Sequence, residues 1–215
     1  MYLASQFTGN RHHAAQLIRQ HPFASLISLD DTGLPYITHL PLHLEADANA
    51  SASGTAMVLL GHVARANPHW RYLEARSEAV VTFLGPHAYL SPQVYPDLAR
   101  VPTWNYLAVH CKVQARVVQE SAAKDALLKK LIGDHEPAYA AQWRGLEAKY
   151  THGMLAGIVG FELEVTGLQC KLKLNQHRPE ALDSTLAMYS NGTDNERELA
   201  QWLAQISAEN QLTGL

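Results

Sequence analysis

The stretch "TWNYLAVHCKVQARVVQE", residues 103–120, has the composition and the alternation of one long β-strand. It is rich in β-branched and aromatic residues, which favour strands. Val113, Ala115 and Val117 alternate with polar residues, which is the pattern of a strand with one buried face. The stretch therefore predicts a long, half-buried strand.

Further apolar stretches on both sides of this strand are bounded by turn residues. Gly33 in "DDTGLP" can adopt the positive φ of a tight turn, so residues 22–29 and 35–44 are predicted to form a hairpin. Residues 45–54 are small and polar and residues 93–102 are irregular, so both are predicted loops. The remaining predicted strands cover residues 55–62, 78–85, 86–92 and 157–168.

Capping residues mark the predicted helices. Asn10 can cap the first helix. Asn67 can cap a short helix with Pro68 in its first position, and Thr193-x-x-Glu196 is a capping box. The predicted helices cover residues 11–20, 66–76, 121–134 (with Ser121 as cap and Gly133 as stop), 136–150 and 193–207.

This order of elements predicts the architecture. Many short antiparallel strands with few crossovers predict a mainly β protein with peripheral helices (α+β), built as a small Greek-key barrel. The helical pair at about 121–150 is predicted to be an insertion packed on the barrel. The length of 215 residues fits one domain, or one domain with an appended segment.

The composition excludes a disordered chain, because 47% of the residues are hydrophobic and 17% are charged. The net charge of -3 lacks the basic excess of a dedicated nucleic-acid binder. No signal-peptide core is present, and no apolar run reaches the ~18–20 residues of a membrane span. These features predict a cytoplasmic protein with no membrane partner, in which Cys111 and Cys170 are reduced, partly buried thiols.

Four segments at or beyond strand ends depart from plain strand composition, and loops at strand ends often carry sites. They are "YITHLP" (36–41), "GHVARANPHW" (61–70), "YLSPQVY" to "VPTWNY" (89–106) and "KLKLNQHR" (171–178). Together they supply cations, hydroxyl and amide donors, and large rings. This mixture suits a ligand with an anionic end and a flat end, such as flavin mononucleotide (FMN) or another nucleotide. The alternative is a set of edge loops with solvated charges and ordinary aromatic packing.

Other kinds of site lack their sequence patterns. The 12 histidines include no His-x-x-x-His pair on a predicted helix, so no metal site is predicted. The absence of a Gly-x-Ser-x-Gly elbow argues against the common serine hydrolases. The absence of a dinucleotide fingerprint argues against a Rossmann domain.

The order of the motifs resembles the PaiB family of FMN-binding negative transcriptional regulators. The motifs are "MYLASQF", "LIRQHPFASLIS", "THLPL", "GHVARANPHW", "FLGPHAYLSP", "VPTWNYLAVH" and "KLKLNQHR". The resemblance covers residues 1–178 and implies an FMN-binding split β-barrel with the helical insertion at about 121–150. It also implies a homodimer with FMN near the subunit interface. Residues 179–215 match the family poorly and are predicted to be a C-terminal helical segment packed on the barrel or the dimer.

The last motif departs from the family pattern Gly-Lys-x-Lys-Leu-Ser-Gln-Asn at three positions. Cys170 replaces the glycine, Asn175 the serine and His177 the asparagine. The loss of the glycine puts the local turn in question, whereas Asn175 can still donate hydrogen bonds.

The residues and the resemblance together predict a set of FMN contacts. Arg65 and the helix start at Asn67 are predicted to meet the phosphate, and Thr38 a ring atom. The cations of residues 171–178 are predicted to close the site from the partner subunit, and Trp104 either covers the ring or packs in the core or dimer. The predicted contacts are Thr38, His39, Leu40, His62, Arg65, Asn67, Ser91, Trp104, Tyr106, Lys171, Lys173, Asn175, Gln176 and Arg178.

Three functions are compatible with these features. The first is an FMN-binding transcriptional regulator, for which DNA binding is implied by the resemblance alone, because no helix-turn-helix pattern and no basic helix occurs. The second is an FMN-dependent oxidoreductase acting on a small molecule, with His39, His62 or Tyr106 as candidate acid or base. The third is a dimeric interaction module that has lost its flavin.

Overall fold

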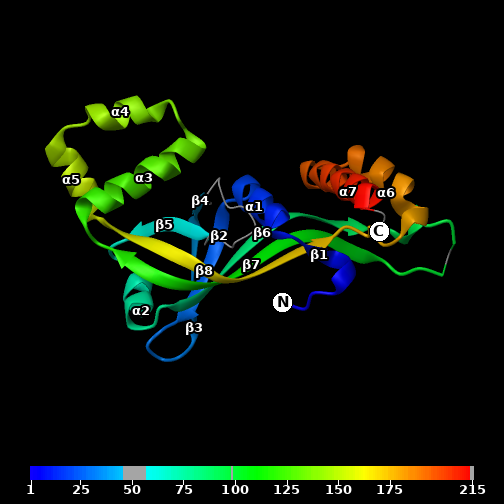
Figure 1. Cartoon of the computed structure of the whole chain (residues 1–215), viewed down its shortest axis with the longest axis horizontal. Helices are drawn as coiled ribbons and strands as arrows, with labels where there is room; N and C mark the ends of the chain where they lie inside the picture. The colour runs from blue at the N-terminus through cyan, green and yellow to red at the C-terminus, as the bar shows by residue number, and fades with distance from the viewer. Residues whose placement is uncertain (46–56, 98, 214–215) are drawn as a thin grey trace. The chain divides into compact units, whose positions relative to one another are not determined.

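The chain folds into two compact units, each built from segments that are far apart in the sequence (Figure 1). The structure, a computed structural model, describes residues 1–45, 57–97 and 99–213. Unit 1 comprises Met1–Leu17, Leu84–Val109 and Gln169–Leu215, and unit 2 comprises Ile18–Phe83 and His110–Leu168. The sequence-based division at residue 178 stays a prediction.

Within the described residues, eight strands form one sheet in the order β3-β2-β6-β7-β8-β5-β4, with β1 paired to β8. β2 pairs antiparallel with β3 and β6, and β8 pairs antiparallel with β1 and β5. The predicted α+β class with antiparallel strands is therefore confirmed. The bounds are β1 Thr8–Gly9, β2 Phe23–Leu29, β3 Pro35–Pro41, β4 His43–Glu45, β5 Val58–Ala64, β6 Glu78–Leu90, β7 Thr103–Val118 and β8 Ile158–Lys173.

The long strand predicted from residues 103–120 is confirmed as β7, Thr103–Val118. Val113 is buried, whereas its neighbours Lys112 and Gln114 are exposed, as the alternation predicted. The hairpin before it is also confirmed, because β2 pairs with β3 across a turn in which Gly33 has a φ of 83°. Only glycine adopts that conformation without strain.

Two predicted strand boundaries are wrong. β6 continues through Gly85 and Pro86, where the sequence predicted a break. A Cβ at Gly85 would lie 2.6 Å from Leu17 Cδ1 and 3.2 Å from Leu107 Cβ, so this glycine permits close packing rather than a turn. β8 likewise continues beyond Leu168, where the predicted strand ended.

The predicted strand 35–44 is divided between two partners. β3 pairs with β2 as far as Pro41, and β4 pairs with β5 from His43 onward. Between them, the Leu42 backbone N–H donates to Pro22 O at 3.0 Å. Most of the predicted loop at 45–54 and the first two residues of the strand predicted at 55–62 lie outside the described residues.

Two helices begin where the sequence placed their caps, whereas the short helix predicted to be capped by Asn67 has Pro68 as its N-cap and begins at His69. Asn10 Oδ1 accepts from the His13 backbone N–H at 2.9 Å at the start of α1, Arg11–Gln20. The capping box before α7 is formed, because the Thr193 backbone N–H donates to a Glu196 carboxylate oxygen at 2.7 Å. α7 covers Asp194–Thr213, and α2 covers His69–Ala75.

The remaining helices differ from the predictions. α3, Ser121–His135, is capped by the Glu120 carboxylate rather than by Ser121, and Gly133 lies inside it. The predicted helix 136–150 is two helices, α4 and α5. A further helix, α6, was not predicted. The bounds are α4 Tyr139–Gly145, α5 Ala148–Ala156 and α6 Leu182–Ser190, with 3-10 turns at Ser5–Phe7, Pro92–Val94 and Pro179–Ala181.

Each unit has its own buried apolar residues. In unit 2, Phe161 of β8 is fully buried, and Leu60 of β5 packs with Leu127 of α3. In unit 1, Leu17 of α1 and Trp202 of α7 are buried. None of the described helices is long and apolar enough to cross a membrane.

Candidate functional site

The predicted contacts fall into two groups, one in each unit. In unit 2 a hydrogen-bonded cluster, which we call the Asn67 network, joins β2, β3 and the start of α2. It consists of Ser28, Tyr36, Thr38, Asn67 and His69. Asn67 Nδ2 donates to Thr38 Oγ1 at 3.2 Å, and Asn67 Oδ1 accepts from the His69 backbone N–H at 3.0 Å. Tyr36 Oη donates to the same Oδ1 at 3.4 Å. Asn67 therefore holds the turn before α2 and at the same time positions Thr38, but the predicted N-cap at Asn67 is wrong by one residue, because Pro68 is the N-cap of α2.

His69 is the centre of this network. Its side chain is fully buried, with Nε2 2.9 Å from Ser28 Oγ and Nδ1 2.8 Å from Thr38 Oγ1. Burial lowers the pKa of His69 to about 4, so the ring is neutral near neutral pH. A neutral imidazole has one donor and one acceptor nitrogen, which one hydroxyl on each side can satisfy.

Two arginines flank one tryptophan at the turn that contains Asn67. The guanidinium carbons of Arg65 and Arg71 lie 5.9 Å and 5.2 Å from the Trp70 ring centroid. Trp70 Nε1 donates to Arg65 O at 3.0 Å, which fixes the ring. Neither arginine has a carboxylate partner among the described residues. We call residues 65–71 the Arg65–Arg71 turn.

Arg65 also supports the local fold. Its Nε donates to Ala156 O at 2.8 Å, and a terminal nitrogen donates to Ile158 O at 3.3 Å. A third contact, to the Gln119 side chain, is long at 3.4 Å. A guanidinium has five N–H donors, so two of them are left for a ligand. The predicted role of Arg65 at a phosphate stays a prediction.

The other predicted residues of unit 2 have different surroundings. His39 Nδ1 lies 3.0 Å from Ser25 Oγ. Leu40 is buried beside Gly61, so its side chain belongs to the core. His62 has a buried Nδ1 with no hydrogen-bond partner among the described residues, and burial lowers its pKa.

Unit 1 contains a cavity of about 400 Å³, which we call the Lys173 cavity. Three predicted contacts, Lys173, Asn175 and Arg178, line it, and no acidic side chain is among the described residues that line it. The lining residues are Gln6, Phe7, Tyr95, Ala99, Arg100, Val101, Thr103, Asn105, Lys173, Asn175, His177 and Arg178.

Lys173 is held at the wall of this cavity by neutral acceptors. Its Nζ donates to Thr103 Oγ1 at 2.6 Å and to Trp104 O at 2.8 Å. Burial lowers its pKa, while the nearby Tyr106 opposes that shift. Lys173 has no carboxylate partner within the described chain, so its charge is not neutralised there.

Two amides complete the polar lining. Asn175 has a φ of 66°, which asparagine tolerates better than most residues, and its Oδ1 accepts from Tyr95 Oη at 2.9 Å. Asn105 is fully buried, and its Nδ2 donates to Tyr189 Oη at 3.1 Å. Asn105 Oδ1 is buried without a hydrogen-bond partner in the described part of the chain.

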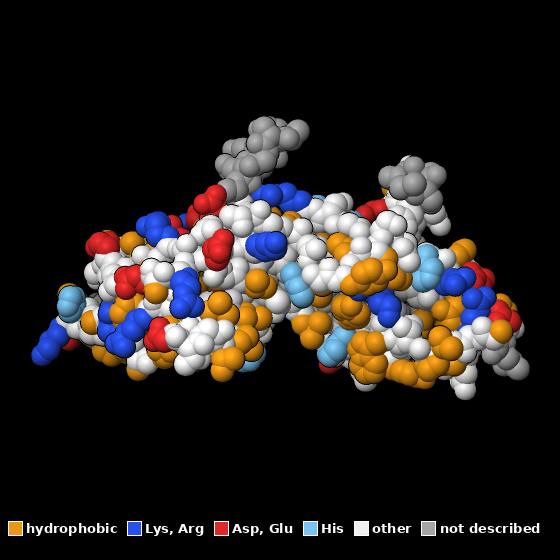
Figure 2. All heavy atoms as spheres, turned by 90° about the horizontal axis from the view of Figure 1, so that it is seen from below, with side chains coloured by type: hydrophobic (Ala, Val, Ile, Leu, Met, Phe, Trp, Pro, Cys, Tyr) orange, Lys and Arg blue, Asp and Glu red, His pale blue; other side chains and the backbone are white. Residues whose placement is uncertain are grey.

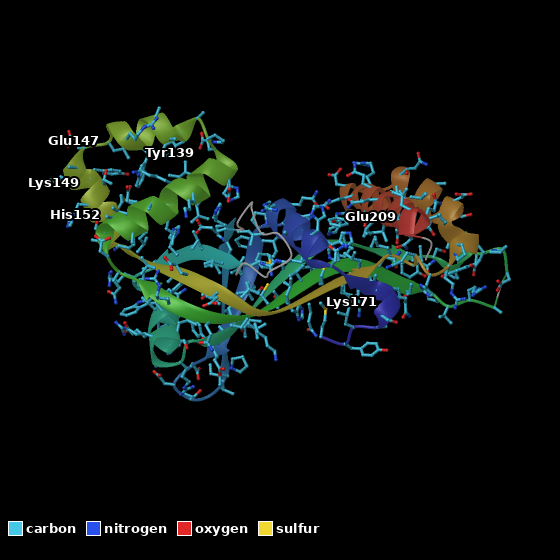
Figure 3. The ribbon with its side chains drawn as sticks, viewed as in Figure 1. Tyr139, Glu147, Lys149, His152, Lys171 and Glu209 are labelled. Carbon is cyan, nitrogen blue, oxygen red and sulfur yellow. The ribbon has the colours of Figure 1, made fainter. Side chains whose placement is uncertain are left out.

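The remaining predicted contacts of unit 1 lie around the cavity or beside it. Tyr106 faces two cations, since Lys171 Nζ is 5.3 Å and Lys173 Nζ is 6.0 Å from its ring centroid. Lys171, labelled in Figure 3, also donates to Tyr2 O at 3.0 Å. Trp104 is 50% exposed.

Two predicted contacts hold the backbone in place. Ser91 Oγ accepts from the Gln93 backbone N–H at 3.2 Å and so caps a 3-10 turn. Gln176 Nε2 donates to Gln6 O at 2.9 Å, which ties the end of β8 to the N-terminal segment.

The replacement of the family glycine by Cys170 is accommodated by a second glycine. Cys170 lies within β8 and pairs with Gly9 of β1. A Cβ at Gly9 would lie 2.7 Å from Cys170 Sγ, so Gly9 leaves the space that the thiol occupies. Both cysteines are buried, and burial raises the pKa of Cys170 to about 12.

The sequence-based list omitted four residues that organise these two groups. His69 and Arg71 follow directly on the Asn67 helix start, so their position at a helix N-terminus was the available signal. Asn105 lies in the segment 89–106 that the sequence singled out but was not selected as a contact, and Ser28 gave no local signal, because its partner lies 41 residues away in the chain. No group of three metal-ligating side chains occurs among the described residues.

The fold is that of the flavin-binding split-barrel class. Among solved structures, it is similar to the flavocytochrome Anf3 from Azotobacter vinelandii, with a TM-score of 0.58, 16% identity, and coverage of 76% of this chain and 67% of that chain. It is also similar to a "putative 5-nitroimidazole antibiotic resistance protein" from Bacteroides thetaiotaomicron, with a TM-score of 0.57, 12% identity, and coverage of 77% and 85%.

The chain belongs to the family described as "Putative FMN-binding domain", the PaiB family, which it matches over residues 1–167. Over 183 residues it is 32% identical to "Protease synthase and sporulation protein PAI 2" of Bacillus subtilis strain 168, covering 84% of each chain. The resemblance predicted from the sequence motifs is therefore confirmed.

Proposed function

We propose that this protein binds FMN and that the Arg65–Arg71 turn holds the phosphate. The observation that carries the proposal is the pair of arginines on Trp70 without a carboxylate partner among the described residues. Guanidinium groups bind phosphate through parallel hydrogen bonds, and the aromatic ring holds the two side chains in place. When bound, FMN supplies reversible electron uptake.

The residues of unit 2 also suit the flat end of the flavin. β3 carries Thr38, whose hydroxyl is fixed by the Asn67 network, and the flavin ring lies along this strand in our proposal. His62 supports the fit because its buried Nδ1 has no partner in the part of the chain that the structure describes, and a flavin offers both donors and acceptors.

The opposite face of the β2–β3 hairpin, away from Thr38, carries exposed apolar side chains, and we assign its cover to a second copy of the chain. The large apolar side chains Leu29, Ile37 and Val80 are 47%, 51% and 36% exposed. Leu29 and Val80 border an open cavity of about 400 Å³ in unit 2. Exposed hydrophobic patches, such as those on the face drawn in Figure 2, are typical of protein interfaces. Light scattering of the purified protein tests this assignment, and a monomer at all concentrations contradicts it.

We propose that the flavin-bound protein acts as a transcriptional regulator rather than as an oxidoreductase of a small molecule. The support is the Bacillus subtilis relative, which is named a protease synthase and sporulation protein. DNA binding predicts retention of the protein on its own promoter DNA, with an affinity that falls steeply as salt rises. Rapid turnover of an added electron acceptor by the flavin-loaded protein instead supports the oxidoreductase.

Replacing Arg71 with alanine is expected to raise the FMN dissociation constant about tenfold, because a charge-assisted hydrogen bond to phosphate is lost. Titration of the protein with FMN, followed by flavin fluorescence, measures this change. Arg65→Ala is expected to weaken FMN binding at least as much, but it also removes contacts to Ala156 O and Ile158 O. Its fold is therefore checked by circular dichroism.

Arg144 of α4 is an exposed arginine outside the turn, and Arg144→Ala is the matched control. It is expected to bind FMN like the unsubstituted protein. Unchanged FMN affinity in both Arg65→Ala and Arg71→Ala contradicts the phosphate site. A protein that stays colourless after incubation with FMN contradicts flavin binding as a whole and supports the flavin-free module.

A further inference from the structure

The Lys173 cavity has features of a small-molecule binding site. Three of its polar lining residues, Lys173, Asn175 and Arg178, belong to the motif that the resemblance predicts to contact FMN, so a separate ligand is tested in competition with FMN. The cavity volume of about 400 Å³ falls within the range of small-molecule sites. We infer that the Lys173 cavity binds a small organic anion that also carries an N–H donor, at a site separate from the flavin.

The charge of the lining selects for an anion. Arg100 is neutralised, since its guanidinium lies 2.9 Å from Asp97 and 3.3 Å from Glu180. Lys173 is different, because both of its acceptors are uncharged and it has no carboxylate partner among the described residues. An ammonium group has three N–H donors, so one remains for a carboxylate or phosphate of the ligand.

The buried amide of Asn105 offers an acceptor to the ligand. Its Nδ2 is used by Tyr189, but Oδ1 is buried and has no partner in the described chain. A buried acceptor without a partner costs free energy, so such atoms in folded proteins usually face a water or a ligand. Since Asn105 lines the Lys173 cavity, a ligand N–H in the cavity would satisfy this oxygen.

The rest of the lining supports recognition of a compact ligand. Asn175 uses Oδ1 to accept from Tyr95, and none of the described residues accepts from its Nδ2, which is left to donate. Phe7 and Val101 form an apolar part of the cavity wall. A carboxylate next to an amide N–H, as in an acylated amino acid, has the required anion and donor in a small molecule.

Three small molecules test separately how much the ligand's negative charge and its N–H donor contribute to binding. N-acetylglycine has a carboxylate and an N–H, N-acetylsarcosine has the carboxylate without the N–H, and N-acetylglycine methyl ester has the N–H without the charge. Each is titrated into isotope-labelled protein, and the amide signals of the cavity residues are followed by NMR. N-acetylglycine is expected to bind saturably and about tenfold more tightly than either analogue.

Variants test the residues that carry the inference. Lys173→Met is expected to lose about tenfold in affinity for N-acetylglycine. Lys149→Met is the matched control, because Lys149 is an exposed lysine of α5 outside the cavity (Figure 3), and it is expected to bind like the unsubstituted protein. Asn105→Leu is expected to bind N-acetylglycine and N-acetylsarcosine equally. If Asn105→Leu does not fold, the comparison of the two probes on the unsubstituted protein tests the same contact.

The titrations are repeated with the protein saturated in FMN. Retained N-acetylglycine binding supports a separate site, whereas displacement by FMN shows that the cavity belongs to the flavin site and overturns the inference. Equal binding of all three probes, or no saturable shift of cavity signals, also overturns it. The first titration is done without FMN. If the protein fails to bind FMN, the titration can therefore still show whether N-acetylglycine binds, and the two proposals can fail separately.

Discussion

As the pH falls from 6.5 to about 4, His69 alone is expected to lower the free energy of unfolding by up to about 3 kcal/mol. In the unfolded chain the ring takes up a proton near pH 6.5, whereas in the folded protein its pKa is about 4. Between these values the unfolded state binds more protons. The stabilisation is therefore complete above pH 6.5 and is lost as the pH falls to about 4.

The structural reason is the position of the ring between two hydroxyls. His69 is fully buried, with Ser28 on one nitrogen and Thr38 on the other. Protonation would place a positive charge on the buried ring, which has no carboxylate partner among the described residues. It would also turn both ring nitrogens into donors. Unfolding relieves both penalties because the ring is then hydrated.

Urea unfolding of the unsubstituted protein and of His69→Gln, from pH 7 to about 4.5, measures this effect. Glutamine keeps one donor and one acceptor but cannot be protonated in this range. We expect His69→Gln to be less stable at pH 7 and to depend less on pH. Carboxylates that titrate at the low end are present in both proteins, so they cancel in the comparison.

His152→Gln is the matched control, because His152 is an exposed histidine of α5 (Figure 3). It is expected to follow the pH profile of the unsubstituted protein. If His69→Gln also follows that profile, the neutral buried state of His69 is disproved.

Replacing Trp202 with alanine is expected to lower the free energy of unfolding by about 3–5 kcal/mol, the cost of removing a large buried ring. Trp202 of α7 is 2% exposed, and its ring centroid lies 6.3 Å from that of His13 in α1. The same two helices are joined by His13 Nε2 and the Glu209 carboxylate at 2.8 Å. α7 is thus part of the core of unit 1.

Leu212 of the same helix provides the control for this substitution. It is 88% exposed, so Leu212→Ala is expected to change stability by less than about 0.5 kcal/mol. Urea unfolding of both variants measures the contrast. A loss below about 1 kcal/mol in Trp202→Ala contradicts a core role for α7.

Strands and helices with strong local signals were predicted well from the sequence. The alternation around Val113 defined β7, and the caps at Asn10 and Thr193 defined the starts of α1 and α7. The breaks predicted near Gly85 and Leu168 were wrong because the tertiary setting outweighed the local signal. At Gly85, close packing against Leu17 and Leu107 explains the glycine without a turn.

α6 was missed for a related reason. Two of its buried residues, Thr185 and Tyr189, are polar, so the helix lacks a clear apolar stripe. Tyr189 Oη accepts from Asn105 Nδ2, an interaction that the pattern of α6 alone cannot reveal.

The candidate site was predictable only in part. Thr38 and Asn67 were both selected, and they are hydrogen-bonded to each other. Their common partner His69 was not selected, because its role depends on burial. The Lys173 cavity depends on contacts between residues 70 to 84 positions apart, such as Thr103 with Lys173 and Asn105 with Tyr189.

The two units share three strands, since β6, β7 and β8 each begin in one unit and end in the other. Neither unit is therefore one continuous segment of the polypeptide chain, and no single truncation yields one complete unit without the other. A fragment that ends at Phe83 or begins at Gln169 would leave one unit with missing strands and exposed backbone edges. Neither unit can consequently be excised or exchanged as one continuous segment of the chain.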